Sequence, residues 1–200
     1  MKTVNIKQLI EDKELLESFC NDMLTGSVAA IPTDTLYGFA AAANNESAVD
    51  KIYKIKGRNF AKPLILFIDN FNELTKMGLN KDDNTDQILK KNWPGALTAI
   101  LPAKTNPQIS AFKFETIGIR IPNHKMLLEL LKTIPFKILT TSANRSGSIS
   151  ENDPVKIQNE FFNEIDWLIE DGIIQDSLPS TVADFSVSPF KILRQGKITL

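Results

Sequence analysis

The sequence predicts an α/β layered sheet formed by one domain that spans residues 1–200. Short apolar runs, typical of buried strands, alternate along the whole chain with segments whose apolar residues recur at helical spacing. No internal repeat, low-complexity tract or linker divides the 200 residues. A chain of this length buries enough surface to fold without disulfides or a structural metal.

The first predicted elements are a helix, a strand and a second helix. Apolar residues such as Leu9, Phe19 and Met23 recur at helical spacing. The run 28–31 is apolar throughout and precedes a proline, as expected of a short buried strand. Residues 47–56 then place their apolar side chains on one helical face.

The same two patterns predict the rest of the chain. Each further strand is a short apolar run, and each further helix shows apolar residues three or four positions apart. The predicted strands are 63–68, 96–101, 117–121, 136–141, 167–169, 181–185 and 191–193, and the predicted helices are 71–77, 86–92, 126–131 and 155–162.

Composition and charge narrow the classes of function. Lys plus Arg (23) nearly balance Asp plus Glu (24), and the formal net charge of −1 argues against broad, nonspecific nucleic-acid binding. Cys20, the only cysteine, lies on the apolar face of the first helix and is expected to be a buried small side chain. The lack of a thiol pair and of a signal peptide predicts a cytoplasmic protein, and no apolar run is long enough to span a membrane.

Residues 32–38 follow the first predicted strand and begin with a proline followed by three consecutive small polar side chains. Thr33, Asp34 and Thr35 suit a small polar substrate, because ligands of open α/β sheets bind beyond the carboxyl ends of strands. Pro, Asp and Gly are also common turn residues, so a plain turn is the alternative.

A cluster of cations lies at residues 56–63, where the second helix meets the next strand. Lys56, Arg58 and Lys62 are close in sequence, with Gly57 between the first two, and such a cluster can surround a polyphosphate. A solvated helix end, where the helix dipole favours cations, has the same composition. The chain has no Gly-x-x-x-x-Gly-Lys-Ser/Thr segment, so an ATP site here is not a P-loop.

Small polar side chains follow the strand predicted at 136–141. Ser142, Asn144 and Ser150 lie on a glycine-containing loop whose hydroxyls and amides can bind phosphate or ribose oxygens, although a plain surface loop has a similar composition. Residues 142–153 also form a candidate lid.

Three isolated polar residues complete the set. Arg120 and Arg194 each end an apolar strand, where a guanidinium group either reaches solvent or binds a carboxylate or phosphate in a cleft. His124 is the only histidine and has no cysteine cluster beside it, so a structural role is predicted in place of a metal site or a catalytic triad.

Taken together, these segments resemble the YrdC-like family of threonylcarbamoyl-adenylate synthases in its short, single-domain form. Residues 32–38 resemble the family's opening motif, and the residues at 56 and 58 and at 142 and 144 match its Lys-x-Arg and Ser-x-Asn pairs. Further matches follow in the family's order at residues 62–64, 93–98, 118–122, 180–182 and 193–196, so the resemblance covers about residues 31–198.

The resemblance implies a twisted mixed sheet with flanking helices around a large concave cavity. It also implies a nucleotidyltransferase that forms threonylcarbamoyl-AMP and pyrophosphate from L-threonine, bicarbonate and ATP, with Mg²⁺ held mostly by the ATP phosphates and no metal ligand from the protein. Lys56 and Arg58 would be catalytic. The implied ATP residues are Lys56, Arg58, Lys62, Thr116, Ser142, Asn144, Ser150 and Arg194, and the implied threonine residues are Thr35, Arg120, Thr140 and Ser180.

The implied product serves the N6-threonylcarbamoyladenosine modification of tRNA. Longer relatives carry an additional C-terminal domain and a His where this chain has Phe67. The short form is therefore expected to pass its product to a separate tRNA threonylcarbamoyl transferase complex, and direct contact with tRNA or double-stranded RNA stays open. Two alternatives are an RNA-binding or ribosome-maturation module, against which the balanced charge counts, and an uncharacterised YciO-like protein of the same fold, against which the intact pairs count.

Overall fold

The computed structural model describes residues 1–60, 62–79, 81–103, 109–111, 113–175 and 178–200. The strands are β1 (Lys2–Asn5), β2 (Ala29–Ile31), β3 (Gly38–Ala42), β4 (Ile65–Phe67), β5 (Leu97–Pro102), β6 (Thr116–Arg120), β7 (Ile138–Ser142), β8 (Trp167–Glu170), β9 (Thr181–Asp184) and β10 (Lys191–Arg194). The helices are α1 (Ile6–Glu11), α2 (Lys13–Leu24), α3 (Glu46–Lys56), α4 (Asn72–Lys76), α5 (Asp83–Asn92), α6 (Lys125–Thr133) and α7 (Pro154–Phe161).

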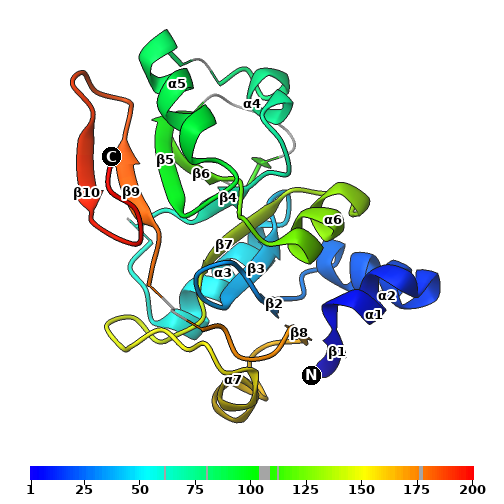
Figure 1. Ribbon diagram of the computed structural model, residues 1–200. Coiled ribbons are helices and arrows are strands. Elements are labelled where there is room, and N and C mark those ends of the chain that lie inside the picture. The colour runs from blue at the N-terminus through cyan, green and yellow to red at the C-terminus, as the bar shows by residue number, and fades with distance from the viewer. Residues whose placement is uncertain (61, 80, 104–108, 112, 176–177) are drawn as a thin grey trace.

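All of these strands pair in one mixed sheet, in the order β1-β8-β2-β3-β7-β4-β6-β5-β9-β10 (Figure 1). β8 is parallel to both β1 and β2, β4 is parallel to β6, and β5 is parallel to β9, whereas the other neighbours are antiparallel. The predicted mixed α/β sheet with flanking helices is thereby confirmed. No helix in the described part of the chain is both long enough and apolar enough to cross a bilayer.

Two strands and one helix boundary are missing from the sequence prediction. β1 and β3 are not predicted, and β3 consists largely of alanine, which is depleted in strands. β3 forms because β2 and β7 hydrogen-bond to both of its edges. The single helix predicted at the N-terminus is two helices, because Asp12 caps α2 by accepting a hydrogen bond from the Leu15 amide at 3.0 Å.

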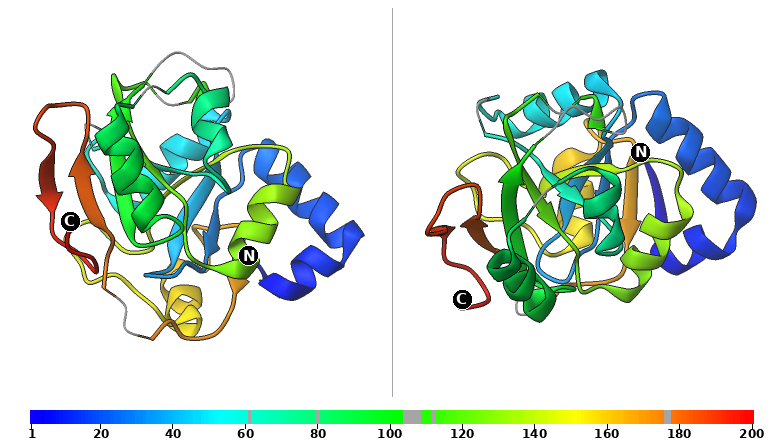
Figure 2. Two further views of the ribbon diagram at one scale, coloured as in Figure 1. Left: turned by 45° about the horizontal axis from the view of Figure 1, so that its top comes forward. Right: turned by 90° about the horizontal axis from the view of Figure 1, so that it is seen from above.

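Alternate strand residues pack into two hydrophobic cores, one on each face of the sheet. On β3, Phe39 and Ala41 belong to the first core and Ala40 and Ala42 to the second. The first core includes apolar residues of α3, α4, α5 and α7, and the second includes those of α1, α2 and α6. Helices therefore flank both faces (Figure 2).

The helices on the second face leave part of the sheet open. α1 and α2 pack beside β1, β8, β2 and β3, far from the β9–β10 hairpin at the other edge (Figure 2). Toward that edge, the second face is formed by Ile65, Ile100, Gly118, Thr140 and Val182, which line a cavity. No described residue of a helix lines this cavity, so the missing helical cover creates the space for a ligand.

Candidate active site

The cavity on the open part of the sheet has a volume of about 280 Å³. Strands β4, β5, β6, β7 and β9 form its floor, and its walls come from the β2–β3 loop, the α3–β4 loop, the loop after β7 and β10. Eight of the twelve residues predicted for ATP and threonine line it, namely Thr35, Arg58, Arg120, Thr140, Ser142, Ser150, Ser180 and Arg194.

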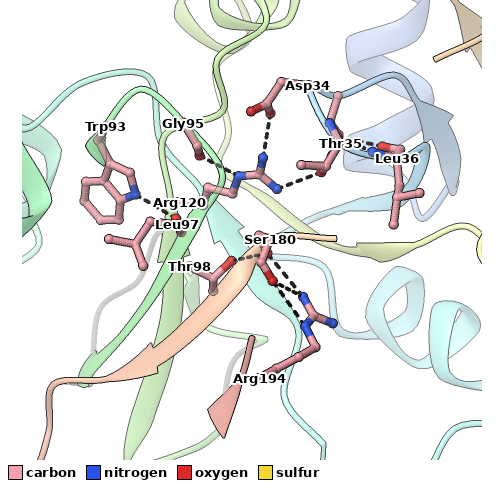
Figure 3. Close-up of polar contacts among 11 residues, drawn as sticks. Asp34, Thr35, Leu36, Trp93, Gly95, Leu97, Thr98, Arg120, Ser180 and Arg194 are labelled. Atoms are coloured by element: carbon pink, nitrogen blue, oxygen red, sulfur yellow. Dashed lines mark hydrogen bonds and ion pairs between the residues drawn. The ribbon is translucent and has the colours of Figure 1, made fainter. Parts of the chain in front are cut away.

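Arg120, the last residue of β6, is buried and is held by three protein groups. Its Nε donates to the Gly95 carbonyl at 2.9 Å, Nη1 to the Thr35 hydroxyl at 2.9 Å, and Nη2 to Asp34 Oδ1 at 2.7 Å (Figure 3). Glycine is needed at position 95 because a Cβ there would lie 2.4 Å from the Asn92 carbonyl oxygen. Burial lowers the pKa of Arg120, and the Asp34 carboxylate opposes this shift. Each Nη atom carries a second N–H group, from which a ligand carboxylate can accept a hydrogen bond.

Thr35 connects this guanidinium group to the β2–β3 loop. The Thr33 hydroxyl donates to the Leu36 carbonyl at 2.6 Å and accepts from the Thr35 and Leu36 amides, each at 3.1 Å. The Thr35 hydroxyl lies 3.1 Å from that of Thr33 and accepts from Arg120 Nη1 at 2.9 Å. A second lone pair of the Thr35 hydroxyl can accept a hydrogen bond from a ligand, as an amine or ammonium group requires.

Ser180 and Arg194 form the wall at the β9–β10 side (Figure 3). The Ser180 hydroxyl lies 2.9 Å from the Thr98 hydroxyl. Arg194 donates from Nε and Nη2 to the Ser180 carbonyl at 3.2 and 2.9 Å, and from Nη2 to its hydroxyl at 3.2 Å. This pair places a guanidinium group and a hydroxyl at one edge of the cavity.

Residues 195–198 hold this wall in place. The Thr181 hydroxyl donates to the Ile198 carbonyl at 2.5 Å and accepts from the Gly196 amide at 3.0 Å. A Cβ at Gly196 would lie 2.3 Å from the Pro179 carbonyl oxygen, so only glycine permits this crossing of the two segments. The fixed crossing keeps β10, and with it the arginine, against the cavity.

Gly57 separates the two cations of the Lys-x-Arg pair. It ends α3 with φ +58°, a left-handed conformation that glycine adopts without strain. After this turn Arg58 lines the cavity, whereas Lys56 is only 3% exposed and does not reach the cavity. Arg58 is held by the carbonyls of Lys62 (from Nε, 3.1 Å) and Pro63 (from Nη2, 3.2 Å).

The Lys56 ammonium group lies behind the start of the loop after β7. It donates to the Ser142 carbonyl at 2.5 Å, the Asn144 carbonyl at 2.8 Å and Asn144 Oδ1 at 2.9 Å. The Ser142 hydroxyl donates to the same Oδ1 at 2.7 Å, so the Lys-x-Arg and Ser-x-Asn pairs form one network. A phosphate would bind Lys56 only by replacing one of these three oxygens, and its role at ATP stays a prediction.

Positive charge exceeds negative charge around the cavity. Burial, and then repulsion by Arg58, lower the pKa of Lys56 to about 8. Burial lowers the pKa of Arg194, which Arg120 and Arg58 lower further. Within the described ranges, Asp34 is the only carboxylate that forms an ion pair with any of these cations. An anionic ligand would relieve this imbalance.

The remaining predicted residues lie outside the lining. Asn144 and Lys56 lie behind the wall, Lys62 is exposed, and Thr116, at the start of β6, is on the same face of the strand as Gly118. The sequence prediction missed several lining residues, namely Tyr37, Ile100, Gly118, Thr141 and Val182. For the missed residues on strands, the sequence shows which side chains share a face of the sheet. It does not show which face is left without a covering helix.

His124 has the structural role predicted for it. Its Nδ1 accepts from the Leu127 amide at 3.2 Å at the start of α6, and its Nε2 lies 3.3 Å from Asp171 Oδ2. Cys20 is half-buried against the second core, and burial raises the pKa of its thiol. The described residues contain no group of three or more His, Cys, Asp or Glu side chains that could hold a metal ion.

Comparison with known proteins identifies the family of the chain. The Sua5/YciO/YrdC family model, described as telomere recombination, matches residues 21–196. A putative threonylcarbamoyl-AMP synthase of Methanocaldococcus jannaschii is 37% identical over 202 residues, covering 100% of this chain and 95% of the relative. A threonylcarbamoyl-AMP synthase of Pyrococcus abyssi is 30% identical over 198 residues, covering 98% of this chain but only 58% of the relative.

Solved structures show the same fold. The crystal structure of P. abyssi Sua5 complexed with L-threonine has a TM-score of 0.82 and 30% sequence identity, and covers 92% of this chain and 55% of that chain. The crystal structure of Escherichia coli YciO has a TM-score of 0.81 and 25% identity, and covers 92% of this chain and 90% of that chain. The chain thus spans nearly all of some relatives and little more than half of others.

Proposed function

Because the chain belongs to the Sua5/YciO/YrdC family, we propose that it forms threonylcarbamoyl-AMP and pyrophosphate from L-threonine, bicarbonate and ATP. The observation that carries the proposal is the convergence of Arg58, Arg120 and Arg194 on one cavity whose other polar lining groups are mainly hydroxyls. A triphosphate and an amino-acid carboxylate are the anions that such guanidinium groups bind best. The reaction class is nucleotidyl transfer.

The two ends of the cavity suit the two larger substrates. At one end, Arg120 offers two N–H groups to the threonine carboxylate, and Thr35 offers an acceptor to its amine. At the other end, Arg58 and Ser150 offer donors to the triphosphate, and the Ser142 hydroxyl, which donates to Asn144 Oδ1, offers an oxygen atom. This division follows the roles implied by the family resemblance.

The proposed reaction has two steps. The amine of threonine attacks the carbon of bicarbonate, which loses water and gives N-carboxythreonine. The new carboxylate then attacks the α-phosphorus of ATP, and the bond to the β-phosphate oxygen breaks to release pyrophosphate. No described lining residue is a Cys, His, Asp or Glu, so catalysis rests on orientation and on guanidinium groups that balance charge on the leaving pyrophosphate.

Mg²⁺ is proposed to enter with ATP. The lining offers the ion hydroxyl and carbonyl oxygens but no carboxylate, so the residues fit Mg²⁺ only when phosphate oxygens supply most of its ligands. When bound, the ion would neutralise part of the charge on the phosphates. Among the lining residues, Ser142 and Ser150 are the ones whose hydroxyl oxygens we propose as ligands of the ion.

Other roles follow from this proposal. The product would pass to a tRNA threonylcarbamoyl transferase complex in the cytoplasm. A double-stranded RNA site is a weaker candidate. Of the predicted cations only Lys62 is exposed outside the cavity lining, and the others are buried or line the cavity, so they do not form an exposed stripe. Lys56 contacts Asn144 directly, so the Lys-x-Arg and Ser-x-Asn pairs are joined. This contact counts against the alternative that the chain is an uncharacterised YciO-like protein without synthase activity.

The first test follows both products in one assay. Purified protein is incubated with ATP, Mg²⁺, radiolabelled bicarbonate and L-threonine, with serine and no-amino-acid controls. We expect threonine-dependent pyrophosphate and labelled adenylate, and a loss of about 100-fold in kcat/KM for Arg58→Ala, because one preorganised charge donor is removed. Lys91→Ala, exposed on α5, is the matched control. A folded wild-type protein that yields neither product would refute the proposal and make RNA binding the next test.

ATP affinity is expected to fall as the pH rises through about 8, where Lys56 loses its proton. Since burial lowers this pKa, the ammonium form exists below that pH and the neutral amine above it. A neutral amine has one N–H fewer for the three oxygens it holds, so the wall that carries Ser142 loosens. Calorimetric titration with ATP from pH 7 to 9.5 measures the effect, and a flat profile would contradict it.

A further inference from the structure

Arg145 lies on the loop that follows Ser142, the last residue of β7, but does not line the cavity. Its guanidinium group forms a bidentate ion pair with Glu164, in which Nη1 donates at 2.8 Å and Nη2 donates to the other oxygen. Nη1 also donates to the Ile55 carbonyl at 2.5 Å, and the guanidinium carbon lies 4.8 Å from the centre of the Phe161 ring. Arg145 thus connects the loop to both α3 and the end of α7.

The loop supplies the hydrogen bonds that the end of α3 lacks. The final carbonyls of a helix have no partner within it. Here the Ile55 carbonyl accepts from Arg145, and the Lys56 carbonyl accepts from the Ser146 amide at 2.8 Å. The Lys56 side chain also binds this region, because its ammonium group donates to the carbonyls of Ser142 and Asn144. The loop and the end of α3 therefore form one unit, so residues 142–146 are not free to move as a lid.

We propose that Arg145 is a positioning residue that fixes Ser142 at the edge of the cavity, and Asn144 behind it, and thereby sets the affinity for ATP. The effect on ATP rests on the proposed function, whereas the anchoring of the loop by Arg145 does not depend on it. The planar guanidinium group matches a carboxylate in two hydrogen bonds, which a lysine cannot reproduce. Because Arg145 and Glu164 are both more than one third exposed, their pair contributes little to global stability, and its main effect is local geometry.

Hydrogen exchange tests the anchoring without any substrate. Amides of residues 142–148 should exchange about 10-fold faster in Arg145→Ala than in the wild-type protein, because the loop opens locally. Arg145→Lys should fall between them. Lys51→Ala is the matched control, since it removes an ion pair of similar exposure between α3 and Asp166 without touching the loop. Unchanged exchange in Arg145→Ala would overturn the inference, whatever the reaction.

Steady-state kinetics test the consequence for ATP. We expect KM for ATP to rise about 10-fold in Arg145→Ala, while KM for threonine and the melting temperature stay close to wild type. The double variant Arg145→Ala with Glu164→Ala should be no worse than the single variant, because one contact is removed twice. An equal rise in both KM values would indicate general disruption and reject the positioning role. A wild-type protein without activity would instead refute the proposed function.

Discussion

Gly118→Val is expected to abolish synthase activity, by about 100-fold or more in kcat/KM, while the protein stays folded. Gly118 lies on β6 and faces the cavity, and a Cβ there would lie 3.4 Å from Thr98 Cγ2 and 3.7 Å from Ile65 Cγ1, which is ordinary contact. The two γ-methyl groups of valine would project into the cavity and displace the substrates from their reactive positions. Valine also suits a strand, so the free energy of unfolding should change by about 1 kcal/mol or less.

Gly118→Ala tests whether the loss of activity depends on the volume added to the cavity. Its single methyl group adds less volume, so the loss of activity should be clearly smaller than for valine. Thermal denaturation of both variants accompanies the product assay. Full activity of the folded valine variant would show that the substrates bind elsewhere, and a large fall in melting temperature would show that β6 itself requires glycine.

Lys56→Met is expected to lower kcat/KM by about 100-fold and also to destabilise the fold. The substitution removes the donor that the carbonyls of Ser142 and Asn144 and the Asn144 side-chain oxygen share. Asn144 Oδ1 keeps the Ser142 hydroxyl at 2.7 Å and the Ser142 carbonyl keeps the Asn144 amide at 3.0 Å, so the main cost, about 1–3 kcal/mol, falls on the Asn144 carbonyl. Loss of the network also frees Ser142 from its position at the cavity.

Lys54→Met is the matched control, because Lys54 is exposed on the same helix. Chemical denaturation and the product assay are carried out on both variants. If Lys56→Met lost activity but kept its stability, the lysine would act mainly on the substrate and the network would matter little. If both properties were unchanged, the structural role assigned to the network would be wrong.

Strands rich in β-branched and large apolar residues were predictable from sequence, and alanine-rich ones were not. Residues 117–121 and 136–141 carry the apolar signal, and they correspond to β6 and β7. β3 depends on hydrogen bonds from its two neighbours, which no local pattern encodes. The pairing of β1 with β8 joins residues more than 160 positions apart, and only the tertiary contacts of the folded chain determine it.

The candidate site was predictable in its residue types but not in all of its geometry. Arg58, Arg120 and Arg194 meet at the cavity, as the resemblance implies. Lys56 and Arg58 are two positions apart, with a left-handed turn at Gly57 between them. After this turn, Arg58 lines the cavity and Lys56 is buried behind it. The need for a glycine turn is visible in the sequence. The direction in which each cation leaves the turn depends on what packs against α3.

The wall formed by Ser180, Arg194 and residues 195–198 has a consequence for synthesis of the protein on the ribosome. Translation proceeds from the N-terminus, so strands β2 to β7 emerge before the residues of this wall exist outside the exit tunnel. A nascent chain therefore passes through a stage in which most of the sheet can pair while the cavity still lacks one side. Strands β9 and β10, which are translated after β2 to β7, complete the enclosure, so the cavity cannot surround a ligand until residues 180–198 have left the ribosome.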